Sequence, residues 1–161
     1  MNRAMLHGAG DFFKVFPAIP ATTVTAAGAA DNVYQAGIVI DRNDISELCH
    51  SAFLAAIATL ANVSGGDDAD FTFQMKHSED AITWADYGTA KTDSETRDEN
   101  TTYSLKAVWD IAGAYRYIRV DWKVDLSASG TDTAQVSGGL VLGPFNATPA
   151  TEVTDVIGES A

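Results

Sequence analysis

The stretch IRVDWKVDL, residues 118–126, decides the fold class. Every second residue from Ile118 to Leu126 is apolar, and the residues between them are charged. A period of two is the pattern of a β-strand that buries one face and exposes the other. Because the exposed face carries only charged side chains, we expect it to meet water or a polar partner.

The same alternation extends outward along the chain. Apolar and polar residues alternate over residues 71–75 and again over residues 102–111. Further strands are expected at residues 33–40, 82–87 and 134–142, which are separated by clusters of Asp, Gly, Ser and Thr. Short strands at this spacing predict a mainly β fold, an antiparallel β-sandwich with a jelly-roll-like arrangement.

One segment has a helical period instead. Apolar residues recur at spacings of three and four over residues 45–60, as on one face of a helix. Asp44 and Glu47 have the spacing of a capping box. We therefore expect one α-helix, over about residues 44–62, inserted in the sandwich. The opposite face of this helix becomes apolar from Leu54 on, which predicts contact with a loop or with another subunit.

The two ends of the chain differ from the middle in composition. Residues 1–30 are rich in Ala, Gly, Thr and Pro, which predicts an extended N-terminal arm with an edge strand at most. Residues 31–143 form the expected sandwich domain with its helix, and residues 144–161 form a C-terminal tail. Both end segments are expected to become ordered only against a neighbour. The candidate interface residues are Phe12, Phe13, Val15 and Phe16 of the N-terminal arm, and Leu54 of the expected helix.

Charge and composition exclude several classes of protein. The 161 residues include 22 acidic and 10 basic side chains, for a net charge of −12, and no basic cluster that would meet a phosphate backbone. The longest apolar run is too short for the roughly 20 residues that span a bilayer, so we expect a soluble protein without a membrane partner. The first residues lack a signal-peptide core, which makes export by that route unexpected. Cys49 is alone, which excludes an internal disulfide.

The sequence offers little for catalysis or metal binding. His7, His50 and His77 have no second histidine at metal-ligand spacing, and no Gly-x-Ser-x-Gly motif occurs. The acidic loop at residues 67–70 has oxygen ligands that calcium would accept, but its spacing matches no calcium loop, and a solvated acidic turn is the alternative. We expect no enzyme activity, no catalytic residue, no cofactor and no metal.

Two other features allow both a purely structural interpretation and a functional one. Residues 93–102 contain no apolar side chain before the next strand, and we expect an exposed mobile loop there, with a binding role as the alternative. Trp84 and Tyr87 can form a platform for stacking on a sugar ring, because aromatic faces pack on apolar sugar faces. The alternative is that both are core residues of a strand, with Ile82 on the same face as Trp84.

Two pairs of segments resemble known proteins. They are TTVTAAGAADNV (22–33) leading to IVIDR (38–42), and YRYIRVDWKVDLSASGTDT (115–133) leading to GGLVLGP (138–144). In style and order they resemble small virion structural proteins of tailed bacteriophages, of the decoration, cement or head-completion type. The resemblance supplies no catalytic residue.

This resemblance implies a capsid decoration or cement protein that stabilises contacts between capsomers, with a head-to-tail connector or tail component as the alternative. It implies the major capsid protein and copies of this chain as partners, in a homo-oligomer or a lattice. It also implies a place on the capsid surface after synthesis in the host cytoplasm. Residues 116–120 are similar to a strand of discoidin-like sugar-binding sandwiches, so the rival function is a carbohydrate-binding module on the virion surface that uses Trp84 and Tyr87.

Overall fold

The computed structural model describes residues 14–44, 49–61, 68–96, 101–126 and 132–143. These residues form nine β-strands and one short 3-10 helix. In chain order the elements are β1 (Lys14–Thr25), β2 (Ile40–Asp41), η3 (Arg42–Asp44), β3 (Ser51–Ala61), β4 (Asp68–Ser78), β5 (Ala85–Asp86), β6 (Lys91–Thr96), β7 (Thr102–Asp110), β8 (Tyr117–Leu126) and β9 (Thr133–Gly143).

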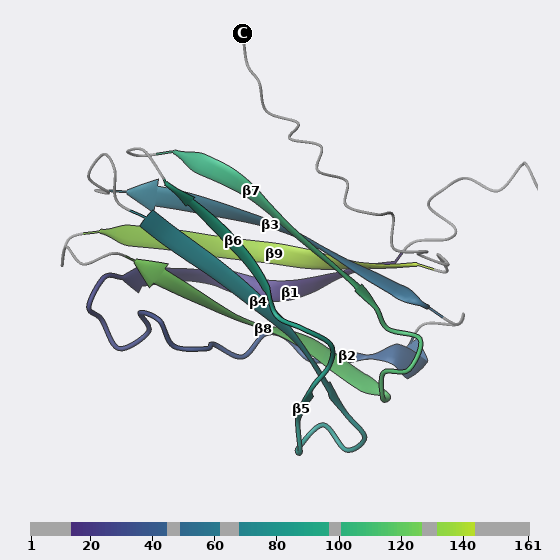
Figure 1. The fold of residues 1–161 in the computed structure, drawn as a ribbon. Helices are drawn as coiled ribbons and strands as arrows, with labels where there is room; N and C mark the ends of the chain where they lie inside the picture. The colour runs from purple at the N-terminus through teal and green to yellow at the C-terminus, as the bar shows by residue number, and fades with distance from the viewer. Residues whose placement is uncertain (1–13, 45–48, 62–67, 97–100, 127–131, 144–161) are drawn as a thin grey trace, which may run out of the picture.

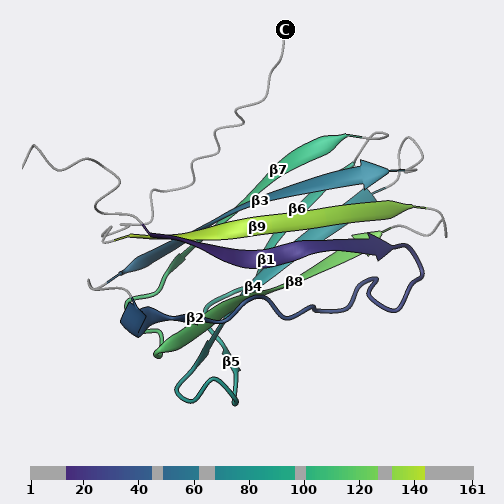
Figure 2. The ribbon, with the colours of Figure 1, turned by 180° about the vertical axis from the view of Figure 1, so that it is seen from behind.

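The strands form two antiparallel sheets that face each other. The first sheet has the strand order β1-β9-β3-β7, and the second has the order β2-β8-β4-β5, with β6 also paired to β4. In Figure 1 strands β4 and β6 of the second sheet lie in front of β9 and β1 of the first, and Figure 2 shows the two layers from behind. The core lies between the sheets, and its largest fully buried side chains include Trp122, Phe71, Phe73, Leu54 and Leu60. The predicted mainly β sandwich is confirmed.

The pairing of the strands is that of a jelly roll. Apart from the two-residue β5, the strands pair from the two ends of the chain inward: β1 with β9, β2 with β8, β3 with β7 and β4 with β6. Alternate pairs fall in opposite sheets. Two sheets built from such nested antiparallel pairs are the jelly-roll arrangement, so this prediction is also confirmed.

Strand β8 follows its predicted alternation. Its apolar residues are buried between the sheets. On the charged face, Arg119 Nε lies 2.7 Å from Asp121 Oδ1, and the Lys123 ammonium donates a hydrogen bond to Asn32 Oδ1 at 2.6 Å. Arg119, Asp121 and Lys123 of the charged face therefore contact polar partners within the chain itself. The strands predicted over residues 71–75, 102–111 and 134–142 are confirmed as β4, β7 and β9.

The helix predicted over residues 44–62 is wrong. Its described part from Ser51 to Ala61 is strand β3, which lies between β7 and β9 in the middle of the first sheet. Hydrogen-bonded pairing on both sides satisfies the backbone groups that a helix would pair internally. The 3-10 helix η3 comes just before residues 45–48, which lie outside the described residues.

The side chains of β3 alternate between the two faces of the sheet. Leu54 and Leu60 are fully buried in the core, while Phe53 and Ile57 lie on the outer face. The helical period placed Phe53 and Ile57 toward the core and Leu54 on the other side. Alanines fill many of the positions between these residues, so the segment fits both periods, and the neighbouring strands decide between them.

Three other predicted segments differ in detail. The polar stretch 93–102, expected as a loop, begins within strand β6 and ends in β7, while residues 97–100 lie outside the described residues. Where strands are expected at residues 33–40 and 82–87, the structure has only the two-residue strands β2 and β5. In the first segment a bend and the bridge between Gln35 and Trp122 precede β2, and in the second segment bends precede β5.

The segment between β1 and β2 closes one side of the sandwich. The Ile38 N–H donates to the Ala18 carbonyl on β1 at 2.8 Å. Gln35 and Trp122 of β8 exchange two backbone hydrogen bonds, of 2.7 and 3.0 Å. Because β1 belongs to the first sheet and β8 to the second, this segment ties the two sheets together.

Strand β1 takes up residues 14–25 of the expected N-terminal arm. It forms one edge of the first sheet and pairs with β9 from Lys14 opposite Leu142 to Thr25 opposite Thr133. Residues 1–13 and 144–161 lie outside the described residues, so the arm and the tail stay predictions beyond these points. The chain enters β1 and leaves β9 at the same corner of the first sheet.

Candidate functional site

A row of apolar side chains crosses the outer face of the first sheet. Val15 on β1 lies opposite Val141 on β9, which in turn lies opposite Phe53 on β3. Phe53 lies opposite Val108 on β7. Val15 is 71% exposed, Phe53 40% and Val108 48%, and Val141 is half-buried. These four residues are called the apolar row, and Ile57, 51% exposed on the same face of β3, extends it.

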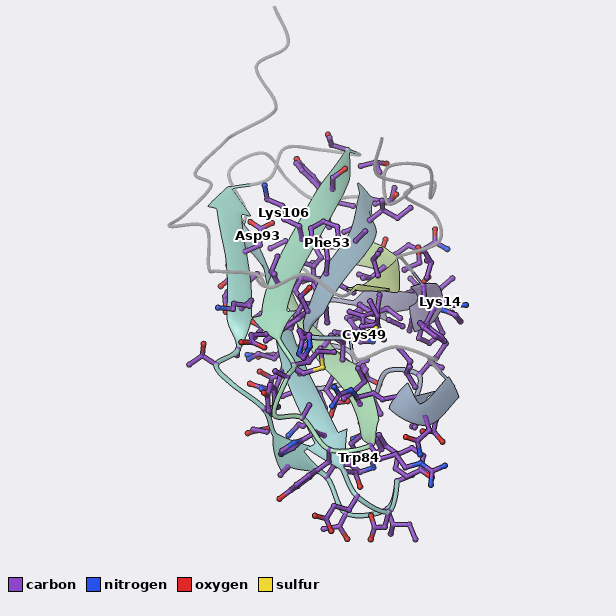
Figure 3. All side chains as sticks on the ribbon, turned by 90° about the vertical axis from the view of Figure 1, so that its right-hand side faces the viewer. Lys14, Cys49, Phe53, Trp84, Asp93 and Lys106 are labelled. Atoms are coloured by element: carbon purple, nitrogen blue, oxygen red, sulfur yellow. The ribbon has the colours of Figure 1, made fainter. Side chains whose placement is uncertain are left out.

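The outer face around the apolar row carries little charge, although the chain has a net charge of −12. Among the described residues of this face, the charged ones are Lys106 and Asp110, both on the edge strand β7. Figure 3 shows Lys106 and Phe53 on neighbouring strands of the sheet. An aligned, exposed and nearly uncharged set of apolar side chains is typical of a protein contact surface.

Both edges of the first sheet carry residues that oppose pairing with another strand. On β1, Pro17 and Pro20 are exposed and have no backbone N–H to donate. On β7, the exposed Lys106 occupies the middle of the strand. Prolines and lysines at sheet edges are common protections against edge-to-edge association. The outer face, rather than either edge, is therefore the surface left open to a partner.

The structure separates the predicted interface residues. Val15 lies in the apolar row, and Phe16 is half-buried and packs against the core. Leu54 is fully buried between the sheets, and its neighbour Phe53 takes the exposed position instead. Phe12 and Phe13 lie outside the described residues.

The sequence carried two signals for this surface, the candidate interface residue Val15 and the residue Val108. In the alternating run 102–111, Val108 is an apolar residue on the otherwise polar side. Such a break in the pattern marks a position whose side chain is apolar without being in the core. Phe53 and Val141 had no comparable signal, because the first was assigned to a helix and the second lies in an apolar run.

A cleft of about 290 Å³ lies at one end of the second sheet. It is lined by His77, Glu79, Asp80, Thr83, Ala85 and Tyr115, and is called the Tyr115 cleft. The rings of His77 and Tyr115 are stacked, with centroids 4.3 Å apart and planes at 8°. The Tyr115 N–H donates to His77 Nδ1 at 3.2 Å, which fixes the histidine against the tyrosine backbone.

The turn beside the cleft is organised by Asp80. Its Oδ1 accepts hydrogen bonds from the Thr83 and Ile82 amides, both at 2.8 Å, and from the Ser78 hydroxyl at 2.9 Å. These bonds, that of Thr83 foremost, lower the pKa of Asp80 to about 2. The carboxylate therefore stays ionised at neutral pH and holds the turn in place.

Trp84 and Tyr87 contact different partners. The Arg119 guanidinium lies over the Trp84 ring, 4.3 Å from its centroid. Tyr87 packs against the core, its ring lies 4.9 Å from that of His77, and its hydroxyl accepts a hydrogen bond from the Gly113 N–H at 3.2 Å. Figure 3 shows Trp84 at the loop end of the second sheet, away from Phe53. The proposed two-ring platform stays a prediction.

The remaining candidate residues are the other histidines and the acidic loop. Within the described ranges, no group of three or more His, Cys, Asp or Glu side chains is arranged to hold a metal ion. Asp68 and Asp70 of the acidic loop begin strand β4, and Asp67 and His7 lie outside the described residues. His50 is half-buried and takes part in backbone hydrogen bonds to Gly143 and Ile111. No described helix is long and apolar enough to cross a membrane.

No protein-family model and no curated protein matches the sequence. Among solved structures, the chain is similar to a protein of infectious bursal disease virus, Gx strain, with 10% identity and a TM-score of 0.49 over 81% of this chain and 31% of that chain. It is also similar to the C-terminal family 22 carbohydrate-binding module of Clostridium thermocellum Xyn10B, with 13% identity and a TM-score of 0.39 over 84% of this chain and 88% of that one.

A third similar structure is the coat protein of tobacco streak virus, with 14% identity and a TM-score of 0.32 over 93% of this chain and 96% of that one. This chain spans about a third of two infectious bursal disease virus chains, 31% of the Gx strain chain and 32% of the VP2 chain of a subviral particle. At these identities and TM-scores the likenesses assign neither a family nor a function. A jelly roll serves coat proteins, lectins and cupins alike, so the function must come from the surfaces of this chain.

Proposed function

We propose that the chain is a non-enzymatic structural protein of a virus particle, most specifically a capsid decoration or cement protein of a tailed bacteriophage. The observation that carries the proposal is the apolar row on the outer face of the first sheet. Full burial of a fully exposed apolar side chain contributes roughly 1.5–3 kcal/mol, and each of these partly exposed side chains contributes a fraction of that when a partner covers it. A row of four across the sheet, with Ile57 beside it, therefore favours a stable contact with another protein subunit.

The occupant of this face is a neighbouring coat subunit, in this proposal the major capsid protein. The face is nearly uncharged, whereas the rest of the chain is strongly acidic, so contact there avoids the repulsion between acidic surfaces. The protected edges of the sheet disfavour strand addition, which leaves docking by the face. The chain also enters β1 and leaves β9 at the corner beside Val15 and Val141, which supports a contribution of the predicted end segments to the same contact.

The experiment is a count of this protein in purified particles made by the genome that encodes it. Quantitative mass spectrometry is expected to find hundreds of copies per particle, as the resemblance to cement proteins implies. A dozen copies or fewer would indicate the connector or tail component instead. Absence from the particles would reject the structural function altogether.

A matched pair of variants tests the surface. Phe53→Ser with Ile57→Ser replaces two exposed side chains of the outer face, and we expect incorporation into particles to fall while the fold is kept. Val33→Ser is the control, because Val33 is as exposed as Val108 but lies in the segment that crosses to the second sheet. Equal incorporation of both variants would show that the outer face is not the contact.

A further inference from the structure

We propose that the Tyr115 cleft binds one sugar ring of an uncharged glycan. This inference concerns the loop end of the second sheet and is independent of the contact proposed for the first sheet. It rests on the shape of the cleft, on its aromatic wall, and on the balance of hydrogen-bond donors and acceptors among its lining residues.

The aromatic wall is Tyr115. Tyr115 is 46% exposed, although its ring is stacked on His77 and its own N–H donates a hydrogen bond to that histidine. His77 is in turn backed by the Tyr87 ring, at 4.9 Å. The exposed ring therefore has a fixed orientation, and a sugar that packs its apolar C–H face on it need not order the tyrosine first.

The lining offers both donors and acceptors. Because Nδ1 of His77 accepts a hydrogen bond from the Tyr115 N–H, the proton of the neutral imidazole is on Nε2, which is a donor. Asp80 Oδ1 already accepts three hydrogen bonds within the turn, whereas Oδ2 accepts one, from the Thr83 hydroxyl at 3.3 Å. Asp80 Oδ2 and the Thr83 hydroxyl oxygen therefore remain acceptors for a ligand. Sugar hydroxyls donate and accept at once, and they match such a mixed lining.

Charge and size restrict the ligand further. The cleft is lined by the carboxylates of Glu79 and Asp80 and by no lysine or arginine, which disfavours sialic acids and other anionic sugars. An ammonium ligand would satisfy the carboxylates but would leave the His77 donor without a partner. The volume of about 290 Å³ is at the small end of ligand pockets, which fits one ring and not a long oligosaccharide.

The test is a titration of the nitrogen-15-labelled full chain with the methyl glycosides of glucose, galactose and N-acetylglucosamine. We expect at least one of the three to shift the amide signals of Thr83 and Tyr115. N-acetylneuraminic acid and choline are the anionic and ammonium probes, and neither is expected to shift these signals. Binding of choline alone, or no shift with any of the three glycosides, would overturn the proposal.

Variants separate stacking from an indirect effect on the fold. Tyr115→Ala is expected to weaken binding roughly tenfold, because the aromatic face is lost, whereas Tyr115→Phe keeps the ring and should retain it. Tyr34→Ala is the matched control, because Tyr34 is 45% exposed but lies beside Lys123 on another part of the surface. Thr83→Val, which removes one acceptor at constant size, should also weaken binding. Unchanged binding by Tyr115→Ala and Thr83→Val would place the ligand elsewhere.

Discussion

Gly37 lies directly against the backbone of Val120. A Cβ atom on Gly37 would be 2.1 Å from the Val120 carbonyl oxygen and 2.8 Å from that of Ala18. These carbonyls belong to β8 and β1, so Gly37 occupies the place where the crossing segment joins the two sheets. Both obstacles are backbone atoms in strands, and neither can rotate away as the end of a side chain could.

Gly37→Ala is therefore expected to destabilise the fold by about 3 kcal/mol, the upper end of the usual cost of overpacking. Urea unfolding followed by tryptophan fluorescence measures this change. Ala36→Ser is the control, because Ala36 is the exposed neighbour of Gly37 and should tolerate an added atom. An unchanged unfolding midpoint for Gly37→Ala would show that the crossing segment does not hold the sheets together.

The stability of the Asp80 turn should depend on pH. The pKa of Asp80 in the folded chain is about 2, below the ordinary value of about 3.9 for an unfolded chain. The stabilisation of the fold by the ionised Asp80 carboxylate is therefore fully present above about pH 4 and is lost as the pH falls toward about 2. Asp80→Ala should lower the urea midpoint at neutral pH, and the difference from the wild type should shrink over that interval.

A variant of the same turn provides the comparison for Asp80. Ile82 is 82% exposed, so Ile82→Ala shortens a side chain of the turn without touching the carboxylate. Its midpoint should follow the wild type at every pH. A constant difference between Asp80→Ala and the wild type down to about pH 2 would contradict the assigned role of the carboxylate.

Lys106 is expected to keep the edge of β7 from pairing with other chains. Lys106→Val removes the charge at the middle of an exposed edge strand and puts a second valine beside Val108 on the outer face, which favours edge-to-edge association. Light scattering of the purified protein should then rise with concentration. Lys106→Glu keeps a charged side chain at the position and should scatter like the wild type. Equal scattering by all three proteins would mean that the edge is protected in some other way.

The contrast between β8 and β3 shows where sequence patterns decide structure. In β8, charged residues separate the apolar ones, so only a period of two fits. In β3, alanines stand among Phe53, Leu54 and Ile57, and the segment satisfies a helical period as well. The strand is selected by its partners β7 and β9, which lie far along the chain. Small residues are needed where β3 packs against β9, because a Cβ atom on Gly138 of β9 would lie 2.8 Å from the Cβ atom of Ala56 on β3.

The candidate sites depended on the fold in the same way. His77 and Tyr115 are 38 residues apart, and they meet because Ser78 at the end of β4 pairs with Tyr117 at the start of β8. No local sequence motif predicts such a cleft. The apolar row likewise exists only through the register of four strands, so the sequence could supply Val15 and the break at Val108 but not their alignment with Phe53.

Alanine substitutions at Phe53 and Leu54 distinguish the observed strand β3 from the helix that the sequence predicts. In the strand, Leu54 is 0% exposed between the sheets and Phe53 is on the outer face, so Leu54→Ala should cost about 2–5 kcal/mol in unfolding free energy. Phe53→Ala should cost about 1 kcal/mol or less, because its side chain is 40% exposed in the isolated chain. The helical period would reverse this order, since it places Phe53 toward the core. Urea unfolding of the two variants therefore tests the register of β3, and a larger loss for Phe53→Ala would contradict it.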